Sequence, residues 1–296
     1  MTAKTHASTR QSTPSSPTQT TMSVLHALVA NPALVLQHRN IFLLSHMRAN
    51  TSLFGHLLGS HPQVEGYYEL HIGYHSWKSL WRQKLVHFSE HSAKPQARWM
   101  FDKVLHDGHA VRPEILLRRQ SRTVMMLREP EQSIKSLVTL YRNDSKVHLP
   151  EASVEGAAAY YIGRLETLAS LAPLLARRFL YLDAECLVQQ TAPTLDRIGR
   201  WLELVGPIPT EYQTFNRTGK SNAGDTSQVL KSGKVSRRSA SYDSIDLAEP
   251  WLGRARDAYA RTRSTLLQHS DVQCTMLGSA CIDDPANVST AEALAR

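Results

Sequence analysis

Residues 40–53 read N-I-F-L-L-S-H-M-R-A-N-T-S-L, and this stretch decides the fold class. Its apolar run, residues 41–44, is typical of a short buried strand, and the polar residues 45–50 are typical of a loop. Leu53 and Leu57 then share one face of a helix that we expect over residues 52–60. A strand that leads through a tight loop into a helix begins a β-α-β unit, so the stretch predicts parallel strand pairing.

The same alternation continues along the chain. Three further strands are predicted, at residues 98–104, 123–127 and 178–182. Four further helices are predicted, one just after Pro130 and the others at 153–176, 192–204 and 246–268. Residues 207–233 look mostly irregular. The sequence therefore predicts an α/β fold, a single domain with a central parallel sheet flanked by helices.

Composition sets the limits of that domain. Hydrophobic residues make up 42% of the 296 residues, which is enough for a full core. Residues 1–22 are half Ser and Thr without an acid, so we expect a disordered tail there, whose composition also fits a targeting segment. The folded domain is then expected over 23–278, with a flexible tail at 279–296.

The apolar runs and the cysteines indicate the cellular compartment of the protein. No apolar run reaches the roughly 18 residues of a membrane span, so none is expected. The three cysteines, Cys186, Cys274 and Cys281, form no C-x-x-C pair. Such sparse cysteines fit a reducing compartment, and we expect a cytoplasmic protein.

The positive charge of the chain is concentrated in one segment. The formal net charge is +8, and residues 217–238 hold six Lys or Arg against one Asp. A segment this basic indicates a solvated surface or a phosphate-bearing partner. A nucleotide, a nucleic acid and another anionic substrate all fit this charge.

Ligands of parallel sheets bind beyond the carboxyl ends of the strands, which directs attention to three segments. The first, after strand 40–45, has Arg48 and the hydroxyls of Thr51 and Ser52 at a helix start, where backbone N–H groups favour an anion. The second follows strand 123–127 with Arg128 and, eight residues later, Ser136. The third is the basic loop around 219–220 and 230–235. Each segment alone is equally compatible with an ordinary polar turn or a solvated loop.

Taken in order, these segments resemble the sulfotransferases that use 3′-phosphoadenosine-5′-phosphosulfate (PAPS). The family pattern R-x-G-T-T-L appears as Arg48-Ala49-Asn50-Thr51-Ser52-Leu53, and R-D-P-x-x-x-x-x-S as Arg128-Glu129-Pro130 with Ser136. Leu180-Tyr181-Leu182-Asp183 with Leu187 is similar to a late strand of the family. Ser60-His61-Pro62 and Tyr68-Glu69-Leu70-His71 are similar to its S-H-P and G-E-L-H turns. The resemblance spans about residues 40–235.

Three positions depart from the family pattern. Asn50 replaces the loop glycine, which Asn can tolerate because it adopts left-handed backbone angles more readily than most residues. Glu129 replaces an Asp. The closing R-K-G is approximated by residues 217–220 or by residues 231–234, and the sequence does not decide between them.

The resemblance implies a P-loop-like sulfotransferase architecture and a sulfuryl transfer from PAPS to a hydroxyl or amine of a small-molecule, lipid or carbohydrate acceptor, without a metal. It implies that PAPS is bound by Arg48, Ala49, Asn50, Thr51, Ser52, Arg128 and Ser136, with the closing loop Lys231, Ser232, Gly233 and Lys234.

The same resemblance implies the catalytic residues. Arg48 would stabilise charge on the leaving phosphate and Lys103 would reach the sulfuryl group, although Lys103 could also be an exposed strand residue paired with Asp102. Glu69 is the first candidate for the base that takes the acceptor proton, and His71 and His106 are the alternatives.

Three other functions have some support in the sequence. His87-Phe88-Ser89-Glu90-His91 matches the inverted zinc-protease pattern H-x-x-E-H, but the sequence offers no third ligand. A nucleic-acid binder would interleave aromatic residues with the basic ones, and residues 217–238 contain none, so we expect no nucleic-acid partner. A kinase-like phosphotransferase would need a Walker lysine, and no G-x-x-x-x-G-K-[ST] occurs.

Overall fold

The computed structural model describes residues 34–143, 147–219, 228–236, 242 and 244–276. Six strands in this part form one sheet, in the order β2-β3-β1-β4-β5-β6. Their bounds are β1 (Arg39–Ser45), β2 (Val64–Glu65), β3 (Trp99–Val104), β4 (Ser121–Leu127), β5 (Phe179–Asp183) and β6 (Val272–Cys274). Every neighbouring pair is parallel, as predicted.

Helices follow the strands along the chain. The longer ones are α2 (Thr51–Gly59), α3 (Trp77–Phe88), α5 (Pro130–Arg142), α6 (Val154–Leu171), α8 (Thr191–Trp201) and α10 (Glu249–His269). Single turns of α-helix are α4 (Pro113–Leu116), α7 (Cys186–Gln189) and α9 (Gln228–Lys231). Short 3₁₀ turns are η2 (Asp107–His109), η3 (Pro150–Ala152) and η4 (Pro173–Leu175).

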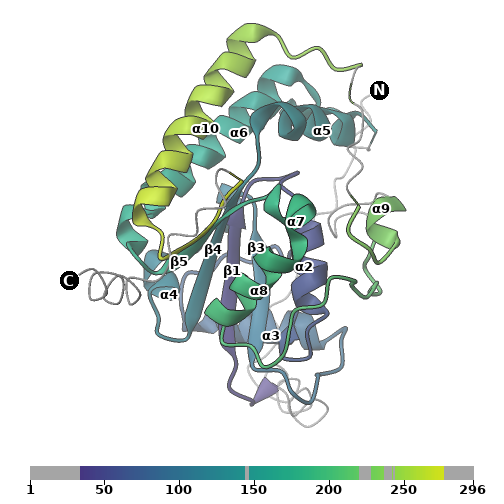
Figure 1. Cartoon of the computed structure of the whole chain (residues 1–296), viewed down its shortest axis with the longest axis vertical. Coiled ribbons are helices and arrows are strands. Elements are labelled where there is room, and N and C mark those ends of the chain that lie inside the picture. Colours follow the sequence, from purple (N-terminus) through teal and green to yellow (C-terminus); the bar gives the residue numbers. More distant parts are fainter. Residues whose placement is uncertain (1–33, 144–146, 220–227, 237–241, 243, 277–296) are drawn as a thin grey trace, which may run out of the picture.

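Two hydrophobic cores lie on the two faces of the sheet. On one face α4, α5, α6 and α10 pack over alternate strand residues such as Phe42 and Leu44. On the other face α2, α7 and α8 pack over Ile41, Leu43 and Phe101. Figure 1 shows these two layers, with α5, α6 and α10 grouped apart from α2, α7 and α8. Because both faces are covered, β1 is a continuous buried apolar run, which is why its sequence shows no alternation.

The predicted strands and helices are confirmed within a few residues, and the differences have local causes. The helix predicted over 153–176 ends at Leu171, because Pro173 follows and the chain continues as the 3₁₀ turn η4. β2 and β6 were not predicted, since two and three residues are too short to show a period. Helix α3 was not predicted either, and its side chains Trp77 and Trp81 are largely exposed.

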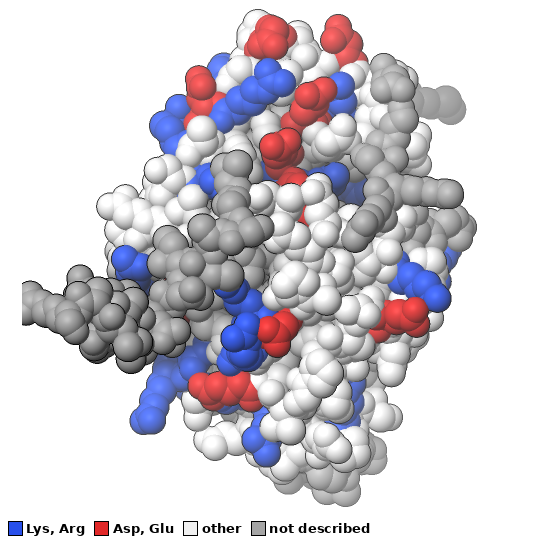
Figure 2. Space-filling model, in the orientation of Figure 1, with Lys and Arg blue, Asp and Glu red and all other residues white. Residues whose placement is uncertain are grey.

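Both predicted tails, 1–22 and 279–296, lie outside the described residues, as does Cys281. None of the helices in the described ranges has the length and apolar character that a bilayer crossing needs. Figure 2 shows acidic and basic side chains interleaved over the end of the molecule formed by α5 and α10. Ion pairs such as Arg256–Glu131 and Lys135–Glu131 belong to this balanced end.

A buried ion pair ties α10 to the end of β5. Arg263 donates from Nε and Nη2 to the two carboxylate oxygens of Asp183, at 3.0 and 2.8 Å, and the Met276 N–H donates to the same carboxylate. Asp183→Ala is expected to lower the free energy of unfolding by about 3 kcal/mol, because it leaves Arg263 unpaired in a mostly buried position. Urea denaturation measures this.

The exposed pair of Asp196 with Arg200 is a matched control. Asp196→Ala is expected to cost less than about 1 kcal/mol, because exposed ion pairs contribute little. Equal losses for the two variants would contradict the stabilising role of Asp183.

Candidate active site

The loops after β1 and β4 meet at the centre of the carboxyl edge of the sheet. The two strands are neighbours, and the helices that follow them, α2 and α5, pack on opposite faces. The two loops therefore diverge from adjacent strand ends, which is the topological switch point where parallel α/β sheets bind ligands. Arg48 lies in the first loop and Arg128 in the second.

The loop after β1 makes a sharp turn before α2 begins. Arg48 and Asn50 both have left-handed backbone angles, with φ of 65° and 57°. The expectation that Asn50 can take the conformation of the missing glycine is confirmed, and its side chain also donates to the carbonyl of Ala184. The turn places Ala49, Thr51 and Ser52 directly at the start of α2.

The two arginines that follow strands come together. Arg128 donates from Nη1 to the backbone carbonyl of Arg48, at 2.9 Å. Arg48 in turn donates from Nε to Ser136 Oγ in α5, at 2.8 Å. Residues 48, 128 and 136, which are up to 88 positions apart in the sequence, therefore form one cluster, which we name the arginine cluster.

Tyr242 also belongs to the arginine cluster, because its hydroxyl donates to Ser136 Oγ at 2.9 Å. Sequence reasoning missed it. The nearest signal was its position four residues after the basic segment 217–238, which indicated a solvated surface or a phosphate-bearing partner but did not single out a tyrosine.

His46 links the loop after β1 to the loop after β4. Burial lowers its pKa to about 3, so the ring is neutral. Nδ1 lies 2.8 Å from the carbonyl of Met47, which can only accept, so Nδ1 carries the proton and Nε2 accepts from the Arg128 N–H at 3.1 Å. The sequence placed His46 directly after a strand but gave no reason to assign it this bridging role.

A second cluster lies where α2 faces β3. Lys103 is 1% exposed, and its Nζ donates to Ser52 Oγ at 3.1 Å. The alternative of an exposed Lys103 paired with Asp102 is wrong, because neighbouring strand residues point to opposite faces of the sheet. The Asp102 carboxylate accepts instead from the Tyr74 hydroxyl and from the backbone N–H groups of Leu70 and Lys103.

Glu69 lies buried beside Asp102. The Leu70 N–H bond to Asp102 fixes the Glu69 backbone to β3, and burial together with the charge of Glu69 raises the pKa of Asp102 to about 8. Within the described part of the chain, Glu69 Oε1 is buried and accepts no hydrogen bond. A buried carboxylate oxygen without a donor is costly, so this atom is suited to receive one from a ligand.

The two alternative bases surround Glu69. His71 Nδ1 lies 3.8 Å from Glu69 Oε1, on a side chain that is nearly half exposed. His106 is close enough for the Glu69 charge to affect its pKa, and burial, the larger influence, lowers that pKa. His106 is therefore neutral at pH 7. All three candidate bases lie together, and Glu69 differs from the other two by a buried oxygen that accepts no hydrogen bond among the described residues.

The buried Arg164 of α6 closes this end of the sheet. It donates from Nε to the Ser45 carbonyl and from Nη2 to the Val104 carbonyl, at 2.9 and 2.8 Å. It therefore holds the last residues of β1 and β3 together. An arginine on the apolar face of a predicted helix was the signal that the sequence analysis overlooked.

The basic loop after residue 210 packs on α2. Lys234 pairs with Glu211 at 3.1 Å, and the N–H of Tyr212 donates to the Gly233 carbonyl. Arg217 pairs with Glu90 and lies over the ring of Tyr68. The predicted closing loop thus adjoins α2 through Tyr212; its residues are Lys231, Ser232, Gly233 and Lys234. Closure of this loop over a nucleotide stays a prediction. Lys220, in the competing segment, lies outside the described residues.

The H-x-x-E-H residues have structural partners. His87 Nε2 lies 3.1 Å from the buried Glu65 carboxylate, His91 contacts the His87 carbonyl, and Glu90 binds Arg217. Among the described residues no three His, Cys, Asp or Glu side chains are grouped to hold a metal ion.

Comparison with solved structures identifies the fold. The chain is similar to the "Sulfotransferase Domain from the Curacin Biosynthetic Pathway", with a TM-score of 0.55 and 18% identity, covering 77% of this chain and 98% of that domain. It is also similar to the "Sulfotransferase Domain from the Synechococcus PCC 7002 Olefin Synthase", with a TM-score of 0.53 and 18% identity, covering 76% and 95%. No family model and no curated protein sequence matches. The chain therefore has the fold of sulfotransferase domains.

Proposed function

We propose that the protein is a sulfotransferase that transfers the sulfuryl group of PAPS to a hydroxyl or amine of a small-molecule acceptor. The observation that carries the proposal is the convergence of Arg48, Arg128 and Ser136 at the switch point of a sheet with the sulfotransferase fold. PAPS supplies an activated sulfuryl group whose leaving group is a phosphate.

The arginine cluster suits the 3′-phosphate. Two guanidinium groups and the hydroxyls of Ser136 and Tyr242 offer charged and neutral donors within one small region. Arginine forks match phosphate oxygens in charge and geometry. Since Arg48 contacts Ser136, we assign its side chain to this end of the nucleotide, while its role toward the leaving phosphate stays a prediction.

The start of α2 suits the opposite end of the nucleotide. The N–H groups of the first helical turn favour an anion, and Thr51 and Ser52 add hydroxyl donors. Lys103, bonded to Ser52, brings a cation to the same place. We therefore assign Ser52 and the helix start to the 5′-phosphate and Lys103 to the sulfuryl group attached to it, where a fixed cation stabilises charge as it develops in an in-line transfer.

Glu69 is the proposed base. Its Oε1 is buried without a hydrogen-bond donor in the described residues, so a hydroxyl or amine of the acceptor can donate to it and then lose its proton to it. His71 and His106, which lie beside Glu69, are the alternatives that the variants in the Discussion separate. Lipid and sugar acceptors are both compatible with this role.

Binding of adenosine 3′,5′-bisphosphate, the product nucleotide, tests the proposal. Arg128→Ala and Arg48→Ala are each expected to weaken it by about 10- to 100-fold, because each removes charge-assisted hydrogen bonds to phosphate. Isothermal titration calorimetry measures the affinity, with ATP and AMP as comparison ligands, and both should bind more weakly to the unaltered protein.

Arg254→Ala, on the exposed surface of α10, is the charge-matched control and should bind the nucleotide as the parent does. The proposal fails if neither cluster variant weakens binding, and tighter binding of ATP would favour a phosphotransferase instead.

A further inference from the structure

A concave site lies at the opposite edge of the sheet from the candidate active site. The pocket has a volume of about 820 Å³ and is formed by the segments that precede β1, β4, β5 and β6, together with the end of α8. Arg39 lines it at the start of β1, whereas the loop with Arg48 follows the other end of that strand. A seven-residue strand spans about 20 Å, so this amino-edge pocket is separate from the candidate active site.

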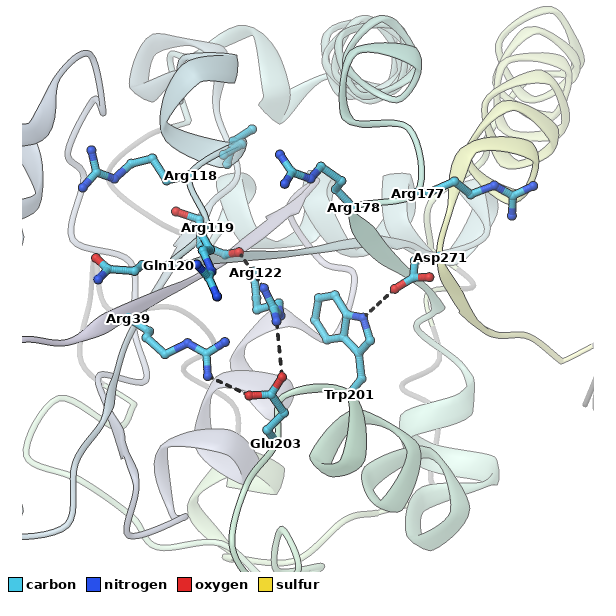
Figure 3. Close-up of a pocket in the computed structure, with 12 residues that line it drawn as sticks. Arg39, Arg118, Arg119, Gln120, Arg122, Arg177, Arg178, Trp201, Glu203 and Asp271 are labelled. Atoms are coloured by element: carbon cyan, nitrogen blue, oxygen red, sulfur yellow. Dashed lines mark hydrogen bonds and ion pairs between the residues drawn. The ribbon is translucent and has the colours of Figure 1, made fainter. Parts of the chain in front are cut away.

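The amino-edge pocket has a strong excess of positive charge. Its lining includes two acidic residues, Glu203 and Asp271, and six arginines, Arg39, Arg118, Arg119, Arg122, Arg177 and Arg178. Figure 3 shows these side chains arriving from separate segments of the chain. Six like charges in one concavity repel one another, so an anionic partner would stabilise the arrangement.

Both acidic residues are already engaged. The Glu203 carboxylate accepts from Arg39 at 2.9 Å and from Arg122 at 3.5 Å, and Asp271 accepts from the Trp201 indole N–H at 3.2 Å, as the dashed lines in Figure 3 show. Glu203 therefore holds two of the six arginines in place, and its single negative charge balances one of them. The remaining four line the pocket without a carboxylate partner among the described residues.

Several of these guanidinium groups keep donors for a ligand. Arg178 donates from Nη1 to the Leu117 carbonyl and Arg177 from Nη1 to the Ser270 carbonyl, which orients each group and uses one of its five N–H donors. Arg118 and Arg119 are exposed, and no hydrogen bond or ion pair involves their side chains within the described ranges.

The backbone of Glu203 has a conformation that is unfavourable for a residue other than glycine. Glu203 has a φ of 57° directly after α8, where its N–H and that of Leu204 close the helix by bonding back to Arg200 and Gly199. Glycine is the usual residue at such a position. A glutamate is strained there, and its carboxylate is the group that joins Arg39 to Arg122.

We propose that the amino-edge pocket binds the phosphate chain of an oligophosphate, as a site separate from that for PAPS. Guanidinium groups from several segments can each take a different phosphate, which favours a ligand with several linked anionic groups over a single small anion. The volume falls within the range of about 300 to 1,000 Å³ that small-molecule pockets occupy.

Recognition of a nucleobase is not part of this proposal. The lining has one aromatic ring, Trp201, whose N–H is bonded to Asp271 and whose ring centroid lies 5.9 Å from the Arg122 guanidinium. The indole N–H and the ring of Trp201 therefore already contact other side chains of the pocket. We expect inorganic tripolyphosphate and ATP to bind through the same phosphate chain with similar affinity.

Calorimetric titration with tripolyphosphate at low salt tests the proposal. Arg118→Ala/Arg119→Ala is expected to weaken binding at least about tenfold, since two charged forks are lost. Arg254→Ala/Arg261→Ala removes the same charge from α10, outside the pocket, and should leave the affinity nearly unchanged. Because Arg118 and Arg119 are exposed, their replacement should not unfold the protein.

Measuring both ligands on variants of each site distinguishes the two sites. In Arg48→Ala/Arg128→Ala, tripolyphosphate should still bind, and in Arg118→Ala/Arg119→Ala, adenosine 3′,5′-bisphosphate should bind as in the parent. The proposal is overturned if the pocket variant retains full tripolyphosphate affinity, if the α10 control loses as much, or if binding disappears only in the Arg48→Ala/Arg128→Ala background. Much tighter binding of ATP than of tripolyphosphate would also contradict recognition through phosphate alone.

Discussion

Replacing Lys103 by methionine is expected to lower kcat for sulfuryl transfer by about 10²- to 10³-fold, while the affinity for adenosine 3′,5′-bisphosphate changes little. The physical reason is the placement of one buried cation. Lys103 is 1% exposed and bonded to Ser52 at the start of α2, so its charge acts where the transferring group is proposed to lie. The product nucleotide lacks that group and should not sense the loss.

Steady-state kinetics and calorimetry on the same preparation measure the two quantities. Methionine is unbranched and only one atom shorter than lysine, so most of the buried volume stays filled and the fold should persist. Lys94→Met is the matched control, because Lys94 donates to the carbonyls of Gly59, His61 and Val64 without touching the candidate site. That control should lower the unfolding temperature and leave kcat per folded molecule nearly intact. Equal kcat losses in both variants would contradict the role of Lys103.

Glu69→Gln is expected to lower kcat by about 10²- to 10⁴-fold, the usual contribution of a positioned general base. Glutamine has nearly the same shape but cannot take the acceptor proton. Since Glu69 Oε1 accepts no hydrogen bond within the described residues and its contact with His71 Nδ1 is long, at 3.8 Å, the substitution should disturb the fold little. Binding of adenosine 3′,5′-bisphosphate should therefore be unchanged.

His71→Gln and His106→Gln complete this experiment, because both side chains lie beside Glu69. We expect each to lower kcat less than Glu69→Gln does. His106 is neutral at pH 7, since burial lowers its pKa, so it remains chemically able to accept a proton. A larger loss in His106→Gln than in Glu69→Gln would transfer the role of base to His106.

The sequence predicted the layers of the fold well. The buried parallel strand β1 is an uninterrupted apolar run over residues 41–44, and the polar residues that follow it mark the functional edge. The substitution of Asn50 for glycine could also be interpreted correctly, because left-handed backbone angles depend on the residue itself. Such features are local, and local chemistry is readable without coordinates.

Contacts between distant segments could not be read in this way. Tyr242 reaches Ser136 across 106 positions, and Arg164 joins the ends of two strands, yet neither residue carries a motif. The amino-edge pocket is the clearest case, because Arg39, the arginines of 118–122 and those of 177–178 are scattered along the chain, away from the basic segment that drew attention first.

The sequence alone predicts an α/β chain with a parallel sheet and places one arginine shortly after each of two strands, because hydrophobic runs and strand ends are properties of short segments. The folded structure was needed to show that Arg128 donates to Arg48 and Arg48 to Ser136, that Lys103 is buried against Ser52, and that a second set of arginines lines the opposite edge. Sheet order and helix packing decide which strand ends and loops become neighbours, and these depend on the burial of the whole chain at once.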